Sequence, residues 1–314
     1  MKINLKNMKP FVTILKVYPL CFVLNLRTFF LLSLISVGLE TGFAQPGQNP
    51  YWERKGLTAI NLSQASLSSW SAGGESALGL DALLTYTADF KKDRHLLNNR
   101  LELAYGLNKT DGNGTRKTND KIYLSSTYGY QLRKNFYLSA LLTFQTQFAK
   151  GYNYDVSQDI FISKFMAPGY LILGAGVTWT PKAYFTLTFT PAAWRGTFVT
   201  NKRLSDAGDF GVKKGKHLFS EFGADLKAEV KYEFLKNMTI YSRLEFYTNY
   251  LEQPQNIDIR WDVLLNMKIN NWFSTNLTTN LIYDNDVKIV QKDGTAGPRV
   301  QFKEILGVGL QFNF

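Results

Sequence analysis

The feature that most constrains the fold of this chain is the alternation of apolar and polar residues over long stretches. Between residues 257 and 270, every odd position is apolar and nearly every even position is polar. A helix would spread these two sets around its circumference, whereas a β-strand places each set on one face. The stretches 222–234 and 136–148 follow the same rule. The sequence therefore predicts long amphipathic strands.

Weaker copies of this alternation bring the number of predicted strands to about twelve. They lie at 56–67, 75–91, 95–108, 119–133, 169–180, 182–193, 237–250, 271–284 and 300–314. Each is long enough for a tilted membrane crossing, which takes about 9–11 residues. Tight turns, such as 92–94, alternate along the chain with longer loops, such as 150–168. This asymmetry is typical of outer-membrane barrels.

The end of the chain gives a further signal. Apolar residues alternate with Gly, Gln and Asn from Leu306 onward, and the chain ends on Phe314. Such a closing strand resembles the signal read by the barrel-assembly machinery of Gram-negative bacteria. A secreted β-sandwich also has alternating strands, but aromatic strand ends such as Trp179 and Trp272 fit membrane-interface girdles better. The predicted fold is all-β, a transmembrane antiparallel up-and-down β-barrel of about 12 strands.

The N-terminal segment has the organisation of a cleaved signal peptide. Five basic residues precede or flank the apolar run at 29–39, and a small-x-small site follows at 42–44. The run is shorter than the roughly 18 apolar residues of a membrane helix. We expect a signal peptide at 1–44, a barrel domain at 45–314 and localisation in the cell outer membrane. Cys21, the only cysteine, would be removed with the signal peptide.

Several motifs of the mature chain point to a known family. They are SWSAGGE at 69–75, KTNDKI at 117–122, SKFMAPGY at 163–170 and QFKE at 301–304, with shorter matches at 128–130, 146–148, 151–152, 256–258 and 283–284. Through them, nearly the whole mature chain resembles an uncharacterised family of Gram-negative outer-membrane β-barrel proteins, a domain of unknown function. TPAA at 190–193 departs from the Ser-Pro beginning expected there. The resemblance implies a barrel and its location, but no activity.

Histidine chemistry is a weak candidate. His95 and His217 are predicted to lie at opposite ends of the barrel, whereas a Ser-His-Asp site needs its groups within hydrogen-bond reach. His217 could pair at the rim with Asp206, Asp209 or Glu221, which keeps an outer-membrane hydrolase as an alternative. We assign no catalytic residue.

No cofactor, metal or nucleic acid is expected. The mature chain lacks thiols and a His-x-x-x-His pattern. An exposed acidic loop explains Asp284, Asp286 and Asp293 better than a calcium site does. The glycines at 73–74 and 112–114 lack the helix and the lysine of a phosphate loop. The chain's net charge of +11 comes from dispersed basic residues, which does not suggest a nucleic-acid partner.

The polar strand faces are predicted to line the lumen, with acids and bases interspersed so that neighbours can pair. The candidate lining residues are Arg100, Glu102, Asp225, Lys227, Glu229, Lys231, Arg243, Glu245, Asp258, Arg260, Asp262, Lys268 and Lys303. They could line a hydrated path for a polar solute, or form a paired network that fills the interior. The interior of a barrel of about eight strands is filled by side chains, whereas a barrel of about sixteen strands leaves an aqueous channel. Because rings of one charge sign are absent, we favour a narrow or plugged lumen.

Two predicted outer loops add candidates for a constriction or a partner site, although simple packing at the rim explains them equally well. These candidates are Trp70, Gly73, Gly74, Ser163, Phe165 and Pro168. The sequence favours a non-enzymatic barrel, a narrow channel or a polar-solute binding or transport protein. A structural or assembly barrel that binds another envelope protein through its outer loops is the other alternative. The expected partners are outer-membrane lipid and the barrel-assembly machinery, and the oligomeric state is open.

Overall fold

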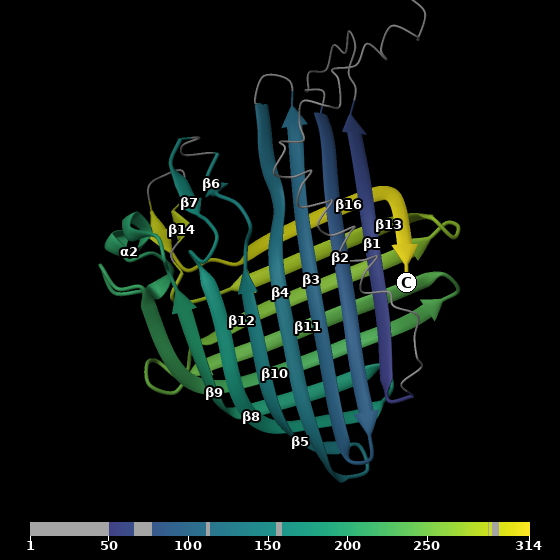
Figure 1. Ribbon diagram of the computed structural model, residues 1–314. Helices are drawn as coiled ribbons and strands as arrows, with labels where there is room; N and C mark the ends of the chain where they lie inside the picture. The colour runs from purple at the N-terminus through teal and green to yellow at the C-terminus, as the bar shows by residue number, and fades with distance from the viewer. Residues whose placement is uncertain (1–49, 66–76, 111–113, 155–158, 288, 291–294) are drawn as a thin grey trace, which may run out of the picture. The chain divides into compact units, whose positions relative to one another are not determined.

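The computed structural model describes residues 50–65, 77–110, 114–154, 159–287, 289–290 and 295–314. Within them, twelve antiparallel strands close into one barrel (Figure 1). The predicted signal peptide at 1–44 and the loop candidates Trp70, Gly73 and Gly74 lie outside the described residues, as does Asp293. In the part of the chain that is described, no helix is long and apolar enough to cross a membrane.

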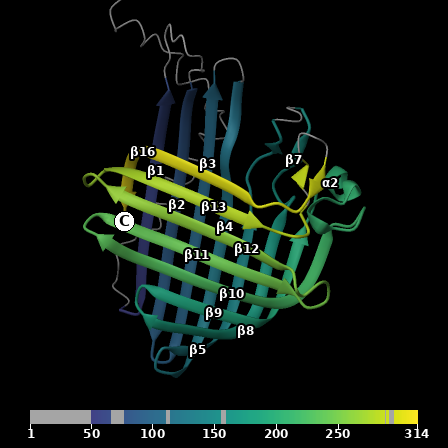
Figure 2. The ribbon, with the colours of Figure 1, turned by 180° about the vertical axis from the view of Figure 1, so that it is seen from behind.

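The barrel strands follow the chain, each beside its predecessor. They are β1 (Trp52–Ala65), β2 (Ala77–Lys92), β3 (His95–Thr110), β4 (Gly114–Arg133), β5 (Phe136–Thr146), β8 (Gly169–Lys182), β9 (Phe185–Phe198), β10 (Leu218–Leu235), β11 (Met238–Asn249), β12 (Ile257–Lys268), β13 (Phe273–Tyr283) and β16 (Gln301–Asn313). β16 pairs with β1 and closes the ring, which Figure 2 shows from behind. The predicted fold, an up-and-down barrel of about 12 strands, is confirmed.

The two ends of the barrel differ. One end, the short-turn end, carries the connections 93–94, 134–135, 183–184, 236–237 and 269–272. Three of these turns hold Asp93, Asn135 and Asn237 at positive φ, which Asp and Asn tolerate better than most residues. The opposite end, the long-loop end, carries the connections 147–168, 199–217, 250–256 and 284–300. From β4 onward, short and long connections alternate as the sequence predicts.

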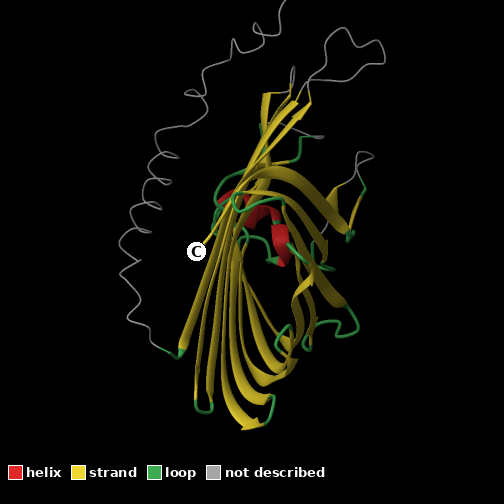
Figure 3. Ribbon diagram, turned by 90° about the vertical axis from the view of Figure 1, so that its right-hand side faces the viewer, coloured by secondary structure: helices red, strands yellow, loops and turns green. Residues whose placement is uncertain are grey.

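Small elements occupy the long-loop end. They are β6 (Gly151–Tyr152), β7 (Phe161–Ser163), α2 (Lys202–Ala207), the 3₁₀ turn η4 (Asp209–Gly211), β14 (Ile289–Val290) and β15 (Ala296–Gly297). Figure 3 shows how little helix there is beside the strands. The Asn201 side chain accepts a hydrogen bond from the Leu204 amide at the start of α2, and Gly208 ends the helix in the left-handed region.

These loops have an apolar core of their own, which we call the cap. Its buried residues are Ala167, Val199, Leu204 and Val212, and Phe161, Phe210 and Phe219 pack against them. The connections 147–168 and 199–217 therefore fold together, because each contributes apolar side chains to one cluster. Arg203 adds a hydrogen bond to the Phe161 carbonyl oxygen across this junction.

Burial in the barrel is the reverse of that in a soluble protein. On the outer face, Trp261 and Leu306 are 45% and 57% exposed. On the inner face, Asp225, Lys227 and Arg243 are 0%, 1% and 3% exposed. Charged side chains are almost never fully buried in water-soluble folds unless they are paired. An apolar outside and a polar inside are what a lipid-spanning barrel requires.

Two strands deviate from the sequence-based prediction. β4 was expected to begin at residue 119 but begins at Gly114, so the connection from β3 is only 111–113 instead of a long loop. In β9, the buried positions are even up to Thr190, whereas from Ala193 onward they are the odd ones together with Gly196. Pro191 lies at this change, where the pairing of β9 with its neighbours shifts register. Because proline cannot donate to the ladder, it is found at such irregularities.

Candidate functional site

The middle of the lumen holds a network of ion pairs centred on Arg243 of β11. Arg243 donates to Glu102 of β3 at 3.0 Å and also to Asp262 of β12. Lys121 of β4 reaches the same two carboxylates, at 2.8 Å from Glu102 and 2.9 Å from Asp262. Each acid therefore pairs with both of these cations. We call these four residues the belt.

The belt joins opposite walls of the barrel. In the closed ring of twelve strands, β11 and β3 are six positions apart, and so are β12 and β4. The pairs Arg243–Glu102 and Lys121–Asp262 therefore each span the lumen. Residues that are more than a hundred positions apart in the chain meet here. Side chains, and not backbone, close the lumen at this level.

Aromatic rings hold the arginines in place. The Arg243 guanidinium lies 3.7 Å from the centre of the Tyr123 ring, and that of Arg100 lies 3.7 Å from the centre of the Tyr241 ring. Arg100 also donates to Glu102 at 2.5 Å. Stacking of a guanidinium on an aromatic face is favourable and fixes the plane of the cation. The guanidinium groups of Arg243 and Arg100 are thus positioned before any solute arrives.

A cavity of about 60 Å³ adjoins the belt, lined in part by Arg100, Lys121, Tyr241 and Asn280. A water molecule needs on the order of 10–15 Å³ of such space, so the cavity has room for only a few waters. The lumen is therefore narrow here and mostly filled by side chains.

A second cluster, the mouth cluster, lies toward the long-loop end around Arg195 of β9. Arg195 donates to both carboxylate oxygens of Glu221, each at 2.6 Å, and to Asp258 at 2.6 Å. Asp286, in the loop after β13, lies 3.9 Å away. The guanidinium also stacks 4.0 Å from the centre of the Tyr247 ring. These residues come from β9 to β13, one side of the ring.

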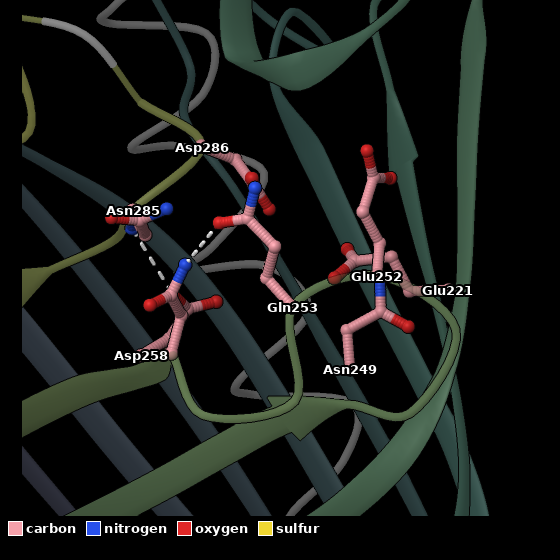
Figure 4. A pocket seen from close by; sticks show the side chains of 8 residues that line it. Glu221, Asn249, Glu252, Gln253, Asp258, Asn285 and Asp286 are labelled. Carbon is pink, nitrogen blue, oxygen red and sulfur yellow. Dashed lines mark hydrogen bonds between the residues drawn. The ribbon is translucent and has the colours of Figure 1, made fainter.

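The mouth cluster borders a pocket of about 70 Å³, shown in Figure 4. Its lining consists of carboxylates and carboxamides, from Glu221, Asn249, Glu252, Gln253, Asn256, Asp258, Asn285 and Asp286. The Asn285 amide donates to Asp258 at 3.2 Å. Burial, together with the nearby Asp284 and Asp258 carboxylates, raises the pKa of Asp286 to about 6.

The mouth cluster is also where a metal would most easily find ligands. Glu221, Asp258 and Asp286 can offer oxygens within 4.8 Å of one another. However, the Arg195 guanidinium already binds two of these carboxylates. A metal ion would have to compete with a buried arginine, so the arrangement favours an ion-pair cluster over a metal centre.

The structure places the other predicted lining residues as follows. Lys227 and Glu229 of β10 lie 3.8 Å apart, and Tyr241 donates to Glu229 at 2.7 Å. Asp225 and Glu245 are buried on β10 and β11. Arg260 stacks on Tyr170 at 4.5 Å, and Lys303 donates to Asn119 at 2.8 Å. Lys231 and Lys268 are exposed near the short-turn ends of β10 and β12.

The described loop candidates lie beside the cap. Ser163 ends β7 and pairs with Gly151 of β6. The Pro168 carbonyl accepts a hydrogen bond from Thr146 at 2.9 Å, which fixes the start of β8 against the end of β5. Phe165 is 52% exposed. None of these three contacts the belt.

The histidines stay far from a catalytic arrangement. His217 donates from Nδ1 to the Val199 carbonyl oxygen at 2.7 Å. Of its suggested acidic partners, Asp206 pairs with Lys202 and Glu221 pairs with Arg195. His95 instead contacts the Tyr128 hydroxyl, beside a turn of the short-turn end. Two of the three acids suggested as partners of His217 are therefore engaged elsewhere.

Sequence reasoning missed some central residues. Lys121 lies in a stretch of weak alternation and was not singled out as lumenal. Arg195 lies beyond the predicted strand end at residue 193, and the change of face at Pro191 hides it. Glu221 was considered only as a partner of His217. The alternation of the polar residues Arg195 and Thr197 after Pro191 is the sequence signal that indicates a continuing strand with its polar face toward the lumen.

Comparisons with known proteins give a family match without an assigned role. Residues 62–152 match a protein family described as Protein of unknown function (DUF3078), which confirms the predicted resemblance over that stretch. No curated protein matches the chain. Among solved structures, an outer membrane channel from Pseudomonas putida F1 is similar, with 13% identity, 86% of this chain and 100% of that chain covered, and a TM-score of 0.38.

Two other solved structures are similar to the same extent. The translocator domain of the autotransporter NalP from Neisseria meningitidis has 10% identity, covers 91% of this chain and 96% of that chain, and gives a TM-score of 0.34. The NanC porin has 8% identity, covers 82% and 98%, and gives a TM-score of 0.36. At this level of similarity, the relatives do not transfer a role to this chain.

Proposed function

We propose that this chain is a non-enzymatic outer-membrane barrel whose lumen forms a narrow path for small polar solutes or ions. In this proposal, residues 1–44 are a signal peptide removed on export, the apolar outer face meets lipid, and the barrel-assembly machinery recognises the closing strand. The observation that carries the proposal is the belt, a buried set of acids and bases that spans the lumen.

The charges of the belt favour a solute path through the lumen, rather than a lumen that is merely filled by side chains. Near the short-turn end, the same barrel fills its lumen with neutral amides, where Asn266 donates to Asn276 at 2.7 Å and also to Gln311. Neutral filling avoids the large desolvation cost of buried charges. If the belt only filled the lumen, its buried charges would cost desolvation energy that neutral side chains avoid. In a constriction, the same charges can replace the water around a passing solute.

Conductance of the refolded barrel in planar bilayers tests this function, with Arg243→Ala as the key variant. Arg243 spans the lumen, so shortening it should widen the constriction. We expect small steps from the wild type, and larger steps with a changed ion selectivity from the variant. Lys202→Ala, an exposed change in the cap, serves as the control. Folded barrels that stay silent with and without Arg243 would refute the channel.

A structural barrel is the second candidate, because the belt already joins opposite walls and the cap offers a folded surface at the long-loop end. Its partner would be another envelope protein, bound through the outer loops. Cells that carry Phe165→Ser, at an exposed position beside the cap, can be compared with cells that carry Arg243→Ala. An envelope defect with the first variant alone would favour the structural role, and a defect with the second alone would favour the channel.

A further inference from the structure

Three neighbouring strands bring together buried polar atoms that have no partner. They are Thr190 Oγ1 on β9, both carboxylate oxygens of Asp225 on β10, and Tyr247 Oη on β11. The three residues are 1%, 0% and 4% exposed. Among the described residues, none donates a hydrogen bond to these atoms, and the side-chain contact of Asp225 with Glu245 brings two carboxyl groups together. Because nearly all buried polar groups in native proteins are satisfied, a group of four calls for an explanation such as a bound ion or water.

The strand register places these atoms side by side. Asp225 is the register partner of Thr190 on β9 and of Tyr247 on β11. Residues opposite each other on one face of a sheet have Cβ atoms about 4.5–5.5 Å apart. The Tyr247 ring is held by the Arg195 guanidinium, so its hydroxyl cannot easily turn away. The three side chains therefore lie at adjacent positions on the lumen face, close to the mouth cluster.

The cations near Asp225 are directed elsewhere. The Lys227 ammonium lies 3.3 Å from the Ser125 hydroxyl and 3.8 Å from Glu229. Arg260 stacks on Tyr170. In the part of the chain that is described, no basic nitrogen lies within ion-pair distance of Asp225. The Glu245 carboxylate, next on the lumen face of β11, interacts with Asp225 and adds negative charge. Asp225 is thus a buried carboxylate without a contact ion pair.

We infer that Thr190, Asp225 and Tyr247 form a lumenal binding site for a hard monovalent cation of the Na⁺ type. All four donor atoms are oxygens, the ligands that hard cations take. One carboxylate and two neutral hydroxyls match a single positive charge, while Lys227 and Arg260 balance Glu245, their register neighbour. In the proposed channel, on which this part of the inference rests, Asp225 is the residue that favours cations over anions.

Cation binding is tested on the refolded barrel by its unfolding temperature, in NaCl and in N-methyl-D-glucamine chloride of equal ionic strength. A ligand that binds only the folded state stabilises it. We expect saturating Na⁺ to raise the unfolding temperature of the wild type by about 5 °C, given about 2–4 °C per kcal/mol for a barrel of this size. Asp225→Asn removes this shift. Glu233→Gln, the same change on the same strand near the exposed short-turn end, keeps it.

Tyr247→Phe is the second variant, in case Asp225→Asn fails to fold. It removes one hydroxyl ligand, whose loss should weaken Na⁺ binding by about 3- to 10-fold. Line broadening of the ²³Na resonance on titration with the wild-type barrel reports the same binding directly. Equal unfolding temperatures of the wild type in the two salts, together with an unbroadened ²³Na line, would mean that only water fills the site, and would overturn the inference.

Reversal potentials in bilayers with asymmetric NaCl separate this inference from the proposed channel. Asp225→Asn should lower the cation preference, and Glu233→Gln should not. A Na⁺-dependent unfolding temperature in a barrel that stays silent would leave the site standing and sink the channel. If the Asp225→Asn variant conducts with the same ion selectivity as the wild type, Asp225 does not set the cation preference, although the proposed channel remains supported.

Discussion

The belt and the mouth cluster are built from the same chemistry but span different parts of the barrel. Each centres on a buried arginine that is 3% exposed, stacks on a tyrosine and binds two carboxylates. Arg243 reaches the opposite wall, whereas Arg195 stays within β9 to β12 and the loop after β13. Identical side-chain chemistry can therefore close a lumen or fasten one side of its mouth. The strand on which each partner lies makes the difference.

Arg243→Ala should have the largest effect on stability. It removes a buried cation that serves both Glu102 and Asp262, and breaking such a pair costs about 3–5 kcal/mol. Urea unfolding of the barrel refolded into lipid vesicles, followed by tryptophan fluorescence, measures this loss. Adding Glu102→Gln should not recover it, because Arg100 and Lys121 would then lose a carboxylate partner. A loss below about 1 kcal/mol would mean that water already solvates the belt.

Arg195→Ala sharpens the comparison, because it should destabilise the barrel without opening the lumen. The free energy of unfolding should fall by about 3 kcal/mol, the lower end for a buried pair, since the adjoining pocket can admit water to Glu221 and Asp258. Conductance steps in planar bilayers should keep the wild-type size. Steps as large as those of Arg243→Ala would show that the mouth cluster, and not the belt, limits the path.

The acidity of Asp286 gives the mouth cluster a pH dependence. Its pKa is raised by burial to about 6 in the folded protein, from 3.8, so the folded state holds the proton more tightly between these values. The free energy of unfolding therefore falls as the pH rises from about 4 to about 6. Above this range, the folded state carries the full cost of the buried, charged carboxylate. Asp286→Asn should unfold at the wild-type temperature near pH 4 and at a higher temperature at pH 7.

Thermal unfolding at the two pH values measures this difference, with Glu304→Gln on the outer face of β16 as a control that leaves the profile unchanged. If Asp286→Asn gives no gain at pH 7, Asp286 is not the group that titrates.

Lys202→Ala, outside both clusters, should have the smallest effect. Lys202 and Asp206 form an i, i+4 pair in α2, and the Lys202 side chain is 85% exposed. Such pairs contribute about 0.3–0.5 kcal/mol. Urea unfolding should place the variant within that range of the wild type, at low and at high salt. A larger loss would show that the cap depends on charge as well as on its apolar cluster.

The strands could be predicted because local pattern alone defines them. The faces at 222–234 and 257–270 remain those of β10 and β12, with Asp225 and Asp258 directed inward. Prediction was weaker where a local irregularity changes the face, as at Pro191, which hid Arg195. It was also weaker at Lys121, whose strand alternates poorly although its side chain completes the belt.

Local sequence pattern is enough to predict the long amphipathic strands, their even number and most of the alternation between short and long connections. A period of two, repeated along the chain, is a local property and can be read without the fold. Which lumenal charges meet depends on the closed barrel. Closure of the barrel brings β3 and β4 opposite β11 and β12. The register between strands then sets the level of each side chain along the barrel axis. Partners such as Glu102 and Arg243 are found by geometry across the barrel, which no local pattern encodes.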